Sequence, residues 1–311
     1  MIVASGTLAP APPYDFDATI RFIEAFTPGE GEQSVRKTTL TKAVTVDGHA
    51  IGFSISSRGT VEQPLLAYDL YAEHRMAPET LAAARERIAF YLSADDNLHP
   101  FYERASVDPP MARLTQAAYG FHQIKFITPF ENACHGLLGQ RTPMAVLKRR
   151  KEALVARFGG AVRIEGELHR AFPNAQQLSA APQEKLAQTI GHEIQARRLL
   201  GCARAFAAVD EAWLRTAPVH EVEQWLLDIE GIGPWTSGFV LIRGLGRMEY
   251  SGIVNDDAIV DAYREVYARP TATALDVRRT ADAYAPLTGY WAFYLRGAGC
   301  ARCASAAVAH G

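Results

Sequence analysis

The sequence predicts an α+β protein in which a small antiparallel sheet domain precedes a larger helical region. Strand-like alternation of polar and apolar residues is concentrated in residues 34–72. Almost everything after residue 95 has the spacing of amphipathic helices, interrupted by proline and glycine. We therefore expect a sheet domain over residues 1–95 and an all-α region over residues 96–311. A chain of 311 residues is long enough for both.

Three strands and a helix are expected in the first domain. The segments SVRKTTLTKAVTV, AIGFSISSRG and PLLAYDLYAE alternate in polarity, and Asp47-Gly48 and Arg58-Gly59 mark the turns between them. A helix follows over PETLAAARERIAFYL, which Pro78 opens. These elements predict a small antiparallel sheet with one or two helices.

The rest of the chain is expected to be a series of helices without internal repeats. Proline, glycine and capping residues divide the amphipathic pattern into short segments. The predicted helices cover residues 111–118, 129–140, 143–158, 182–189, 192–208, 210–215, 220–228, 234–246, 257–268, 273–284 and 287–296.

Composition and charge limit the kinds of partner. No apolar run reaches the ~18 residues of a membrane span and the first residues lack a basic start, so we expect a cytoplasmic protein without membrane contact. The net charge of −2 argues against a protein that simply coats DNA. Residues 1–120 carry 10 basic and 15 acidic side chains, whereas residues 121–250 carry 16 and 13. An anion-binding surface is therefore expected in the middle of the chain.

The cysteines do not predict a metal site. Cys300 and Cys303 form a C-x-x-C pair, but a zinc or iron–sulfur site needs two more ligands at suitable spacing. Cys134 and Cys202 fall in helical segments, where they are expected to be small core residues. We expect no catalytic metal and no cofactor.

The most informative stretch is LLDIEGIGPWTSGFVLIRGLGR, residues 226–247. Gly231 and Gly233 cannot lie inside a helix without a cost of about 1 kcal/mol each, so they predict a tight turn. Pro234 suits the first position of a second helix, where its missing N–H is not needed. A helix, a hairpin turn and a helix are predicted, with unpaired N–H groups that favour an anion at the turn.

A second polar cluster follows at Asn255-Asp256-Asp257, before an amphipathic helix. Asparagine and aspartate at such a position commonly cap the helix. One carboxylate is enough for the cap, which leaves the second available for another task near the hairpin. The run Lys148-Arg149-Arg150-Lys151 is interpreted as a solvated basic cluster on a helix.

These motifs together resemble the helix-hairpin-helix DNA glycosylase superfamily, and within it bacterial DNA-3-methyladenine glycosylase II. The likeness covers nearly the whole chain. It is carried by IEGIGPWTSGFVLIRGLG and VNDDAIV, and in addition by PPYDF, FENACHGLLGQRTP, FPNAQQLSAAP, IGHEIQARRLLGCARAF and GYWAFYLR. The resemblance implies a TATA-binding-protein-like sheet domain, followed by a helical region of two lobes with the active site between them.

The resemblance also implies roles for individual residues. Alignment of NDDAIVD with the family places the catalytic carboxylate at Asp257, where it would stabilise an oxocarbenium-like sugar or activate water. A backbone phosphate would lie on the hairpin, together with a monovalent cation bound at residues 229–234. The hairpin residues are Gly231, Ile232, Gly233 and Thr236. The expected wall of the base pocket comprises Trp235, Gln140, Phe239, Tyr290 and Tyr294. Arg141 is a candidate wedge between the DNA strands, although relatives usually carry an apolar residue there. Arg296 stands close to the position where relatives often carry tryptophan.

Trp235 predicts the subclass. Bifunctional members of the superfamily carry a Schiff-base lysine at this position, and tryptophan has no amine. An aromatic face can stack on a flipped base and attract the positive charge of an N-alkylated purine. We therefore expect a monofunctional, monomeric enzyme of base excision repair that releases alkylated purines from damaged double-stranded DNA. The alternatives are a glycosylase of the same fold for deaminated or oxidised bases and a non-catalytic DNA-binding hairpin protein.

Overall fold

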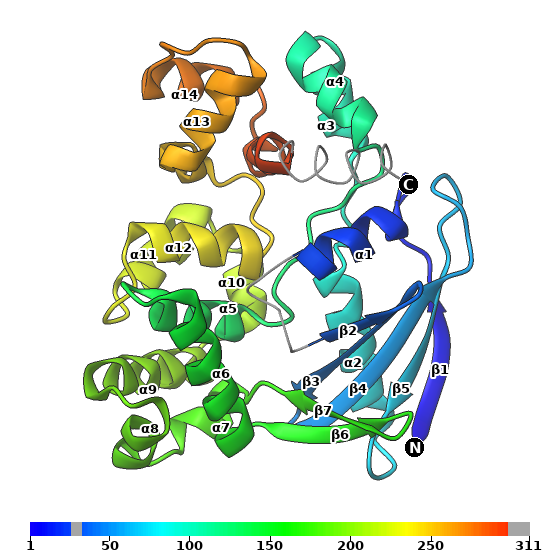
Figure 1. Ribbon diagram of the computed structural model, residues 1–311, viewed down its shortest axis with the longest axis vertical. Helices are drawn as coiled ribbons and strands as arrows, with labels where there is room; N and C mark the ends of the chain where they lie inside the picture. Colours follow the sequence, from blue (N-terminus) through cyan, green and yellow to red (C-terminus); the bar gives the residue numbers. More distant parts are fainter. Residues whose placement is uncertain (26–32, 298–311) are drawn as a thin grey trace.

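The computed structural model describes residues 1–25 and 33–297 of the chain. Figure 1 shows a sheet at one side, a group of helices beside it and a second group of helices above both. The predicted α+β class is confirmed. In the described ranges the first group comprises α5 to α12, and the second comprises α3, α4, α13, α14 and a helical stretch over residues 288–297.

The sheet has five antiparallel strands in the order β1-β5-β4-β3-β2. Strands β4 and β5 match predicted segments, but the first predicted segment, SVRKTTLTKAVTV, turns at Lys37 (φ +56°) and forms two paired strands, β2 and β3. Strand β1 was not predicted, because its burial is irregular rather than alternating. Helix α2 covers one face, where apolar side chains of the central strands meet Ile88 and Leu92. The elements are β1 (Ile2–Leu8), α1 (Phe16–Ala25), β2 (Gln33–Arg36), β3 (Thr39–Val46), β4 (His49–Ser57), β5 (Leu66–Tyr71) and α2 (Pro78–Tyr91).

The region predicted to be all-α also contains a β-hairpin, which is a correction. Strands β6 (Gly160–Ile164) and β7 (Glu167–Ala171) pair around Glu165-Gly166, whose φ angles are both positive. The hairpin packs on the face of the sheet away from α2, since a Cβ on Gly52 of β4 would lie 2.5 Å from the Ile164 side chain. Two-residue turns in which both residues have positive φ are typical of β-hairpins. In the sequence the only sign of this one is Gly166 between the short runs GAVRI and ELHRA, which did not lead to a predicted hairpin.

The helices of the first group agree with the predicted ranges to within a few residues, except that α7 (Ala175–Ser179) was not predicted. Their apolar sides form one core, which includes the buried Cys134 and Cys202 as expected. The elements are α5 (Pro129–Gly139), α6 (Met144–Phe158), α7 (Ala175–Ser179), α8 (Gln183–Ile190), α9 (Glu193–Ala208), α10 (Glu211–Thr216), α11 (Val219–Leu227), α12 (Pro234–Phe239) and a π-helical turn, η2 (Val240–Gly244).

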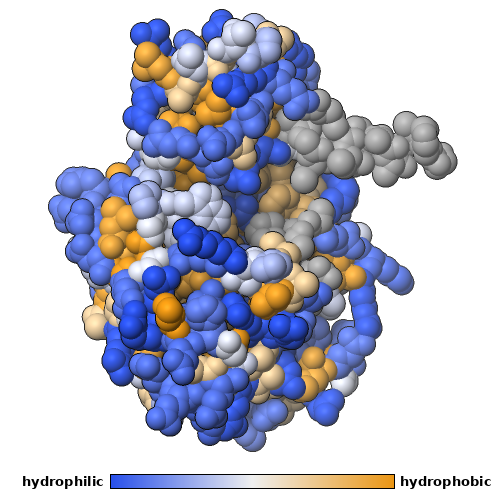
Figure 2. All heavy atoms as spheres, turned by 60° about the vertical axis from the view of Figure 1, so that its left-hand side comes forward, coloured by the Kyte–Doolittle hydropathy of each residue, from blue (hydrophilic) through white to orange (hydrophobic). Residues whose placement is uncertain are grey.

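The second group of helices has a separate core around Trp291 and Phe101. Its members are far apart in sequence: α3 (His99–Ser106) and α4 (Pro109–Ala117) pack with elements that follow residue 250. The latter are a short 3-10 turn, η3 (Ser251–Asn255), and the helices α13 (Asp257–Val266) and α14 (Ala274–Asp282). Figure 2 shows a mostly hydrophilic face that is indented below this group.

Candidate active site

The predicted hairpin lies between α11 and α12. Gly231 has a φ of +94°, a left-handed conformation that favours glycine, and it reverses the chain after α11. Ile229 and Ile232 are buried and anchor the turn, and the N–H of Ile232 donates to the carbonyl of Ile229 at 3.0 Å. The turn therefore exposes backbone while its apolar side chains point into the core.

The start of α12 leaves several N–H groups available. The N–H of Ser237 donates to the carbonyl of Gly233 at 2.9 Å, and Pro234 has no N–H to offer. In the described chain, the N–H groups of Gly233, Trp235 and Thr236 have no backbone partner. A Cβ built on Gly233 meets no atom within 4 Å, so this edge of the hairpin is open to a ligand.

The Thr236 side chain does not belong to this open edge. It is buried, and its methyl group lies 2.6 Å from the position that a Cβ on Gly136 of α5 would take. The side chain thus closes the contact between α12 and α5, and only the backbone of Thr236 can face a phosphate.

Gln140 braces the hairpin and does not line the aromatic pocket described below. Its Nε2 donates to the carbonyl of Gly231, and its Oε1 accepts from Arg198 of α9 at 3.3 Å. The residue ends α5, so these two bonds tie α5, α9 and the turn together. Arg141 follows with an exposed side chain and a φ of +50°, a conformation that few non-glycine residues adopt.

An aromatic pocket of about 200 Å³ lies between α12 and the second group of helices. Trp235 is 61% exposed and is not the core residue that tryptophan usually is. It stacks on Phe239 with ring centroids 5.1 Å apart and an interplanar angle of 18°. The pocket residues are Pro234, Trp235, Gly238, Phe239, Tyr250, Gly252, Ile253, Asn255, Asp256 and Arg296. The stacked pair thus offers an apolar wall at the hairpin.

Of the two adjacent aspartates, Asp256 lines the pocket and Asp257 does not. Asp256 is the N-cap of α13, and one carboxylate oxygen accepts the N–H of Ala258 at 2.9 Å. The other oxygen lies 3.7 Å from the guanidinium of Arg296. Asp257 is exposed in the first turn of α13. Asp256 is therefore both the helix cap and the carboxylate of the pocket, whereas the sequence predicted that one aspartate would cap the helix and Asp257 would lie in the site.

Tyr290 and Tyr294 lie in the core rather than in the pocket, contrary to the prediction. Both are buried, and the Tyr290 hydroxyl donates to the carboxylate of Asp96. The Tyr294 hydroxyl bonds with that of Tyr102 at 2.9 Å. Burial raises the pKa of both hydroxyls well above the usual range, and the neighbouring Asp96 raises that of Tyr290 further. Both hydroxyls thus make hydrogen bonds inside the second core and do not point into the aromatic pocket.

The described residues hold no cluster of three or more His, Cys, Asp or Glu side chains that could bind a metal. Cys300 and Cys303 lie outside the described residues. Within the described ranges, every helix is too short or too polar to cross a membrane.

The fold is that of the helix-hairpin-helix DNA glycosylases. A 3-methyladenine DNA glycosylase from Archaeoglobus fulgidus superposes with a TM-score of 0.76 at 19% identity, over 94% of this chain and 97% of that one. An 8-oxoguanine glycosylase/lyase from Clostridium acetobutylicum superposes with a TM-score of 0.65 at 13% identity, over 94% and 95% of the two chains. At these identities the likeness concerns the fold alone.

A curated relative points to one branch of this class. The chain is 30% identical over 167 residues to a DNA-3-methyladenine glycosylase of Bacillus subtilis (strain 168), a match that covers 52% of this chain. The chain thus spans about half of that relative, 55% of its length. No family model matches the chain. The predicted resemblance to helix-hairpin-helix glycosylases, and to the 3-methyladenine type among them, is confirmed.

Proposed function

We propose that the protein is a monofunctional DNA glycosylase that flips alkylated purines of the 3-methyladenine type out of double-stranded DNA and excises them. The observation that carries the proposal is the position of a carboxylate, Asp256, in the same pocket as the stacked Trp235 and Phe239, next to an open hairpin. A protein that only bound DNA through the hairpin would have no use for this pocket, which argues against the non-catalytic alternative.

In this proposal the hairpin binds a backbone phosphate of the damaged strand. The N–H groups around Gly233 and the start of α12 supply the contacts, and Gln140 fixes the turn through Gly231. A monovalent cation at residues 229–234 would bind to backbone carbonyl oxygens. Those of Ile229 and Gly231 already accept N–H groups and keep one lone pair each, so such an ion fits. When bound, it would add positive charge beside the phosphate.

The pocket then receives the flipped base. An N-alkylated purine is positively charged, which favours stacking on an aromatic face and makes the base a good leaving group. Little acid catalysis is needed. The departing base leaves an oxocarbenium-like sugar, and a nearby carboxylate stabilises that charge or orients water.

We assign the carboxylate to Asp256, because it lines the pocket and the bond from Ala258 N–H fixes one oxygen, while the other lies 3.7 Å from Arg296 of the same lining. Asp257, to which the alignment points, remains the alternative. The monofunctional part of the proposal follows from the lining: none of the ten pocket residues is a lysine, so none can form a Schiff base with the sugar.

Arg296 supports a second candidate substrate class, deaminated or oxidised bases. Its guanidinium adds a hydrogen-bond donor and a positive charge at the pocket, which suits a neutral base with an exposed carbonyl better than a cationic one. Its approach to Asp256 at 3.7 Å offsets part of that charge, and for this reason we retain alkylated purines as the first proposal.

The test is a release assay on duplexes that each carry one defined lesion: 3-methyladenine, 7-methylguanine, hypoxanthine or 8-oxoguanine. We expect release of the alkylated purines and an abasic strand that breaks only after hot alkali. Borohydride should trap no covalent protein–DNA adduct. Release confined to the neutral bases would favour the second candidate, and a trapped adduct would contradict the monofunctional assignment.

A further inference from the structure

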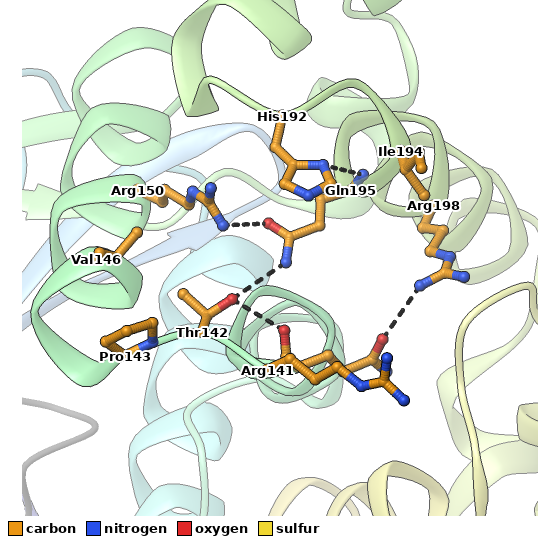
Figure 3. Close-up of a pocket in the computed structure, with 10 residues that line it drawn as sticks. Arg141, Thr142, Pro143, Val146, Arg150, His192, Ile194, Gln195 and Arg198 are labelled. Atoms are coloured by element: carbon orange, nitrogen blue, oxygen red, sulfur yellow. Dashed lines mark hydrogen bonds between the residues drawn. The ribbon is translucent and has the colours of Figure 1, made fainter.

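A second cavity, about 690 Å³ in volume, includes Gln140 in its lining and shares no lining residue with the aromatic pocket. We call it the arginine cleft. It is bounded by the turn after α5, by α6 and by the start of α9 (Figure 3). Its lining comprises Gln140, Arg141, Thr142, Pro143, Val146, Arg150, His192, Ile194, Gln195 and Arg198, and therefore includes three arginines and no carboxylate.

Arg150 is held in this cleft by neutral groups only. Its Nε donates to the carbonyl of Ile190 at 3.0 Å, and its Nη1 donates to Oε1 of Gln195 at 2.7 Å. No carboxylate of the described chain lies within ion-pair distance of it. A half-buried guanidinium that is fixed in place without a counter-charge favours an anion in the cleft.

The other polar groups of the cleft are also fixed. Gln195 accepts from Arg150 and donates to the hydroxyl of Thr142 at 3.4 Å, and Thr142 donates in turn to the carbonyl of Gln140 at 2.9 Å (Figure 3). Nδ1 of His192 accepts the N–H of Gln195 at 3.3 Å, so the proton of the neutral ring is on Nε2. The donors are thus oriented before any ligand binds, which lowers the entropy cost of binding.

The position of the cleft identifies its ligand. Gln140 joins the cleft to the hairpin, because it contacts both Arg198 and Gly231. Arg141, the candidate wedge between the DNA strands, lines the cleft itself and directly follows Gln140. If the damaged strand lies on the hairpin and Arg141 enters the duplex, the cleft beside Arg141 is placed to meet the other strand.

We propose that the arginine cleft binds a backbone phosphate of the strand opposite the lesion. The inference rests on the proposed function, since it takes the hairpin as the site of the damaged strand. A phosphodiester matches the planar fork of an arginine and needs no base-specific group. The contact would hold the duplex while the base is out of the stack, whatever the sequence.

The experiment measures binding, not base release, so that it is independent of the lesion that the enzyme accepts. The probe is a duplex with a tetrahydrofuran abasic analogue, in which single phosphates of either strand are replaced by neutral methylphosphonates. For the wild-type protein we expect one or two substitutions on the opposite strand to weaken binding on the order of tenfold, as for loss of one hydrogen bond to a charged group.

Arg150→Gln should be insensitive to the same substitution. Its own affinity should be lower on the order of tenfold, and its salt slope smaller by about one unit. Arg149→Gln is the matched control, because Arg149 is the exposed neighbour on α6 outside the cleft. If Arg150→Gln has a lowered melting temperature, Arg150→Lys, which keeps the charge but not the planar guanidinium, takes its place in the same binding assay.

The proposal is overturned if no opposite-strand methylphosphonate weakens wild-type binding, or if the substitution that Arg150→Gln ignores lies on the damaged strand. Failure of the proposed function has a different signature: the wild-type protein would then bind the abasic duplex no better than undamaged DNA, or would bind it and release no base.

Discussion

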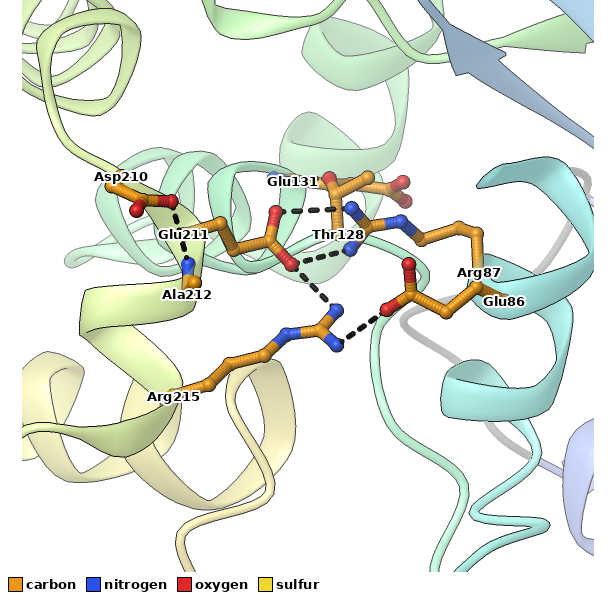
Figure 4. Close-up of polar contacts among 8 residues, drawn as sticks. All are labelled: Glu86, Arg87, Thr128, Glu131, Asp210, Glu211, Ala212 and Arg215. Atoms are coloured by element: carbon orange, nitrogen blue, oxygen red, sulfur yellow. Dashed lines mark hydrogen bonds and ion pairs between the residues drawn. The ribbon is translucent and has the colours of Figure 1, made fainter. Parts of the chain in front are cut away.

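Arginines occur in two contrasting settings in this molecule. At the junction between α2 and α10, Arg87 forms a bidentate pair with Glu211 at 2.7 and 3.0 Å, and Arg215 pairs with Glu211 at 2.6 Å and Glu86 at 2.9 Å (Figure 4). The guanidinium of Arg215 also lies 3.9 Å from the centre of the Phe90 ring. In the arginine cleft, by contrast, Arg150 has only neutral partners (Figure 3).

Arginines that pair with carboxylates stabilise the contact between two elements, whereas an arginine with only neutral partners can bind an anionic ligand. At the junction each guanidinium pairs with at least one carboxylate, so these ion pairs link the sheet domain to the first helical group. In the cleft, Arg198 lies 3.8 Å from Glu230, whereas Arg150 has only neutral partners and can gain a counter-charge only from a ligand. We therefore expect junction variants to change stability, and site variants to change binding or catalysis while the fold stays intact.

The largest effect is expected from Asp256→Asn. Base release under single-turnover conditions should fall by roughly 10²-fold or more, the typical cost of one preorganised electrostatic group. Asparagine caps a helix about as well as aspartate, so the melting temperature should be nearly unchanged. Asp257→Asn is the matched control and should keep near-wild-type release. If the two variants behave the other way round, the family alignment is right and the pocket assignment is wrong.

Glu211→Gln should lower stability instead. Loss of charged hydrogen bonds to two arginines costs about 2 kcal/mol, or roughly 5 °C in melting temperature. Thermal unfolding followed by circular dichroism measures this loss, and base release well below the transition should not change. A variant that releases base poorly while its melting temperature is unchanged would contradict the division between the two settings.

The pH dependence of the same variant gives a sharper test. Burial by itself would raise the pKa of Glu211, but hydrogen bonds and charges from Arg87 and Arg215 outweigh it and lower the pKa below its ordinary 4.5. A carboxyl whose pKa is lower in the folded protein than in the unfolded chain contributes its full stabilisation at a pH above the unfolded-state pKa. This contribution is lost as the pH falls through the folded-state pKa. The difference in stability between wild type and Glu211→Gln should therefore be full at pH 7 and shrink below about pH 4.5.

Gly233→Ala is expected to have the smallest effect, confined to DNA binding. The backbone at Gly233 has a φ of −99°, which alanine adopts, and the added Cβ meets no protein atom. The methyl group would stand where a phosphate is proposed to lie and should weaken binding severalfold for every lesion. Gly201→Ala, another exposed site with open space around the Cβ, is the control. Equal affinity of both variants for the abasic duplex would argue against the hairpin contact.

Local chemistry made much of this protein predictable from its sequence. Gly231 and Pro234 predict a turn and a new helix because one tolerates a positive φ and the other lacks an N–H, and both stand where expected. The central strands and most helices were predicted from periodicity, which reports burial on one face. The short strands β6 and β7 were not predicted, because their alternating pattern spans only a few residues.

Tertiary packing decided which side chains face the site. Asp256 and Asp257 are chemically alike, and only the start of α13 places one in the pocket and the other in solvent. The basic run on α6 was taken for a solvated cluster, yet its Lys151 is buried against Glu131 at 3.0 Å while Arg150 enters the arginine cleft. Successive residues on a helix point about 100° apart, so a run of charged residues in the sequence does not show which of their side chains contact a partner. That depends on the elements packed around the helix.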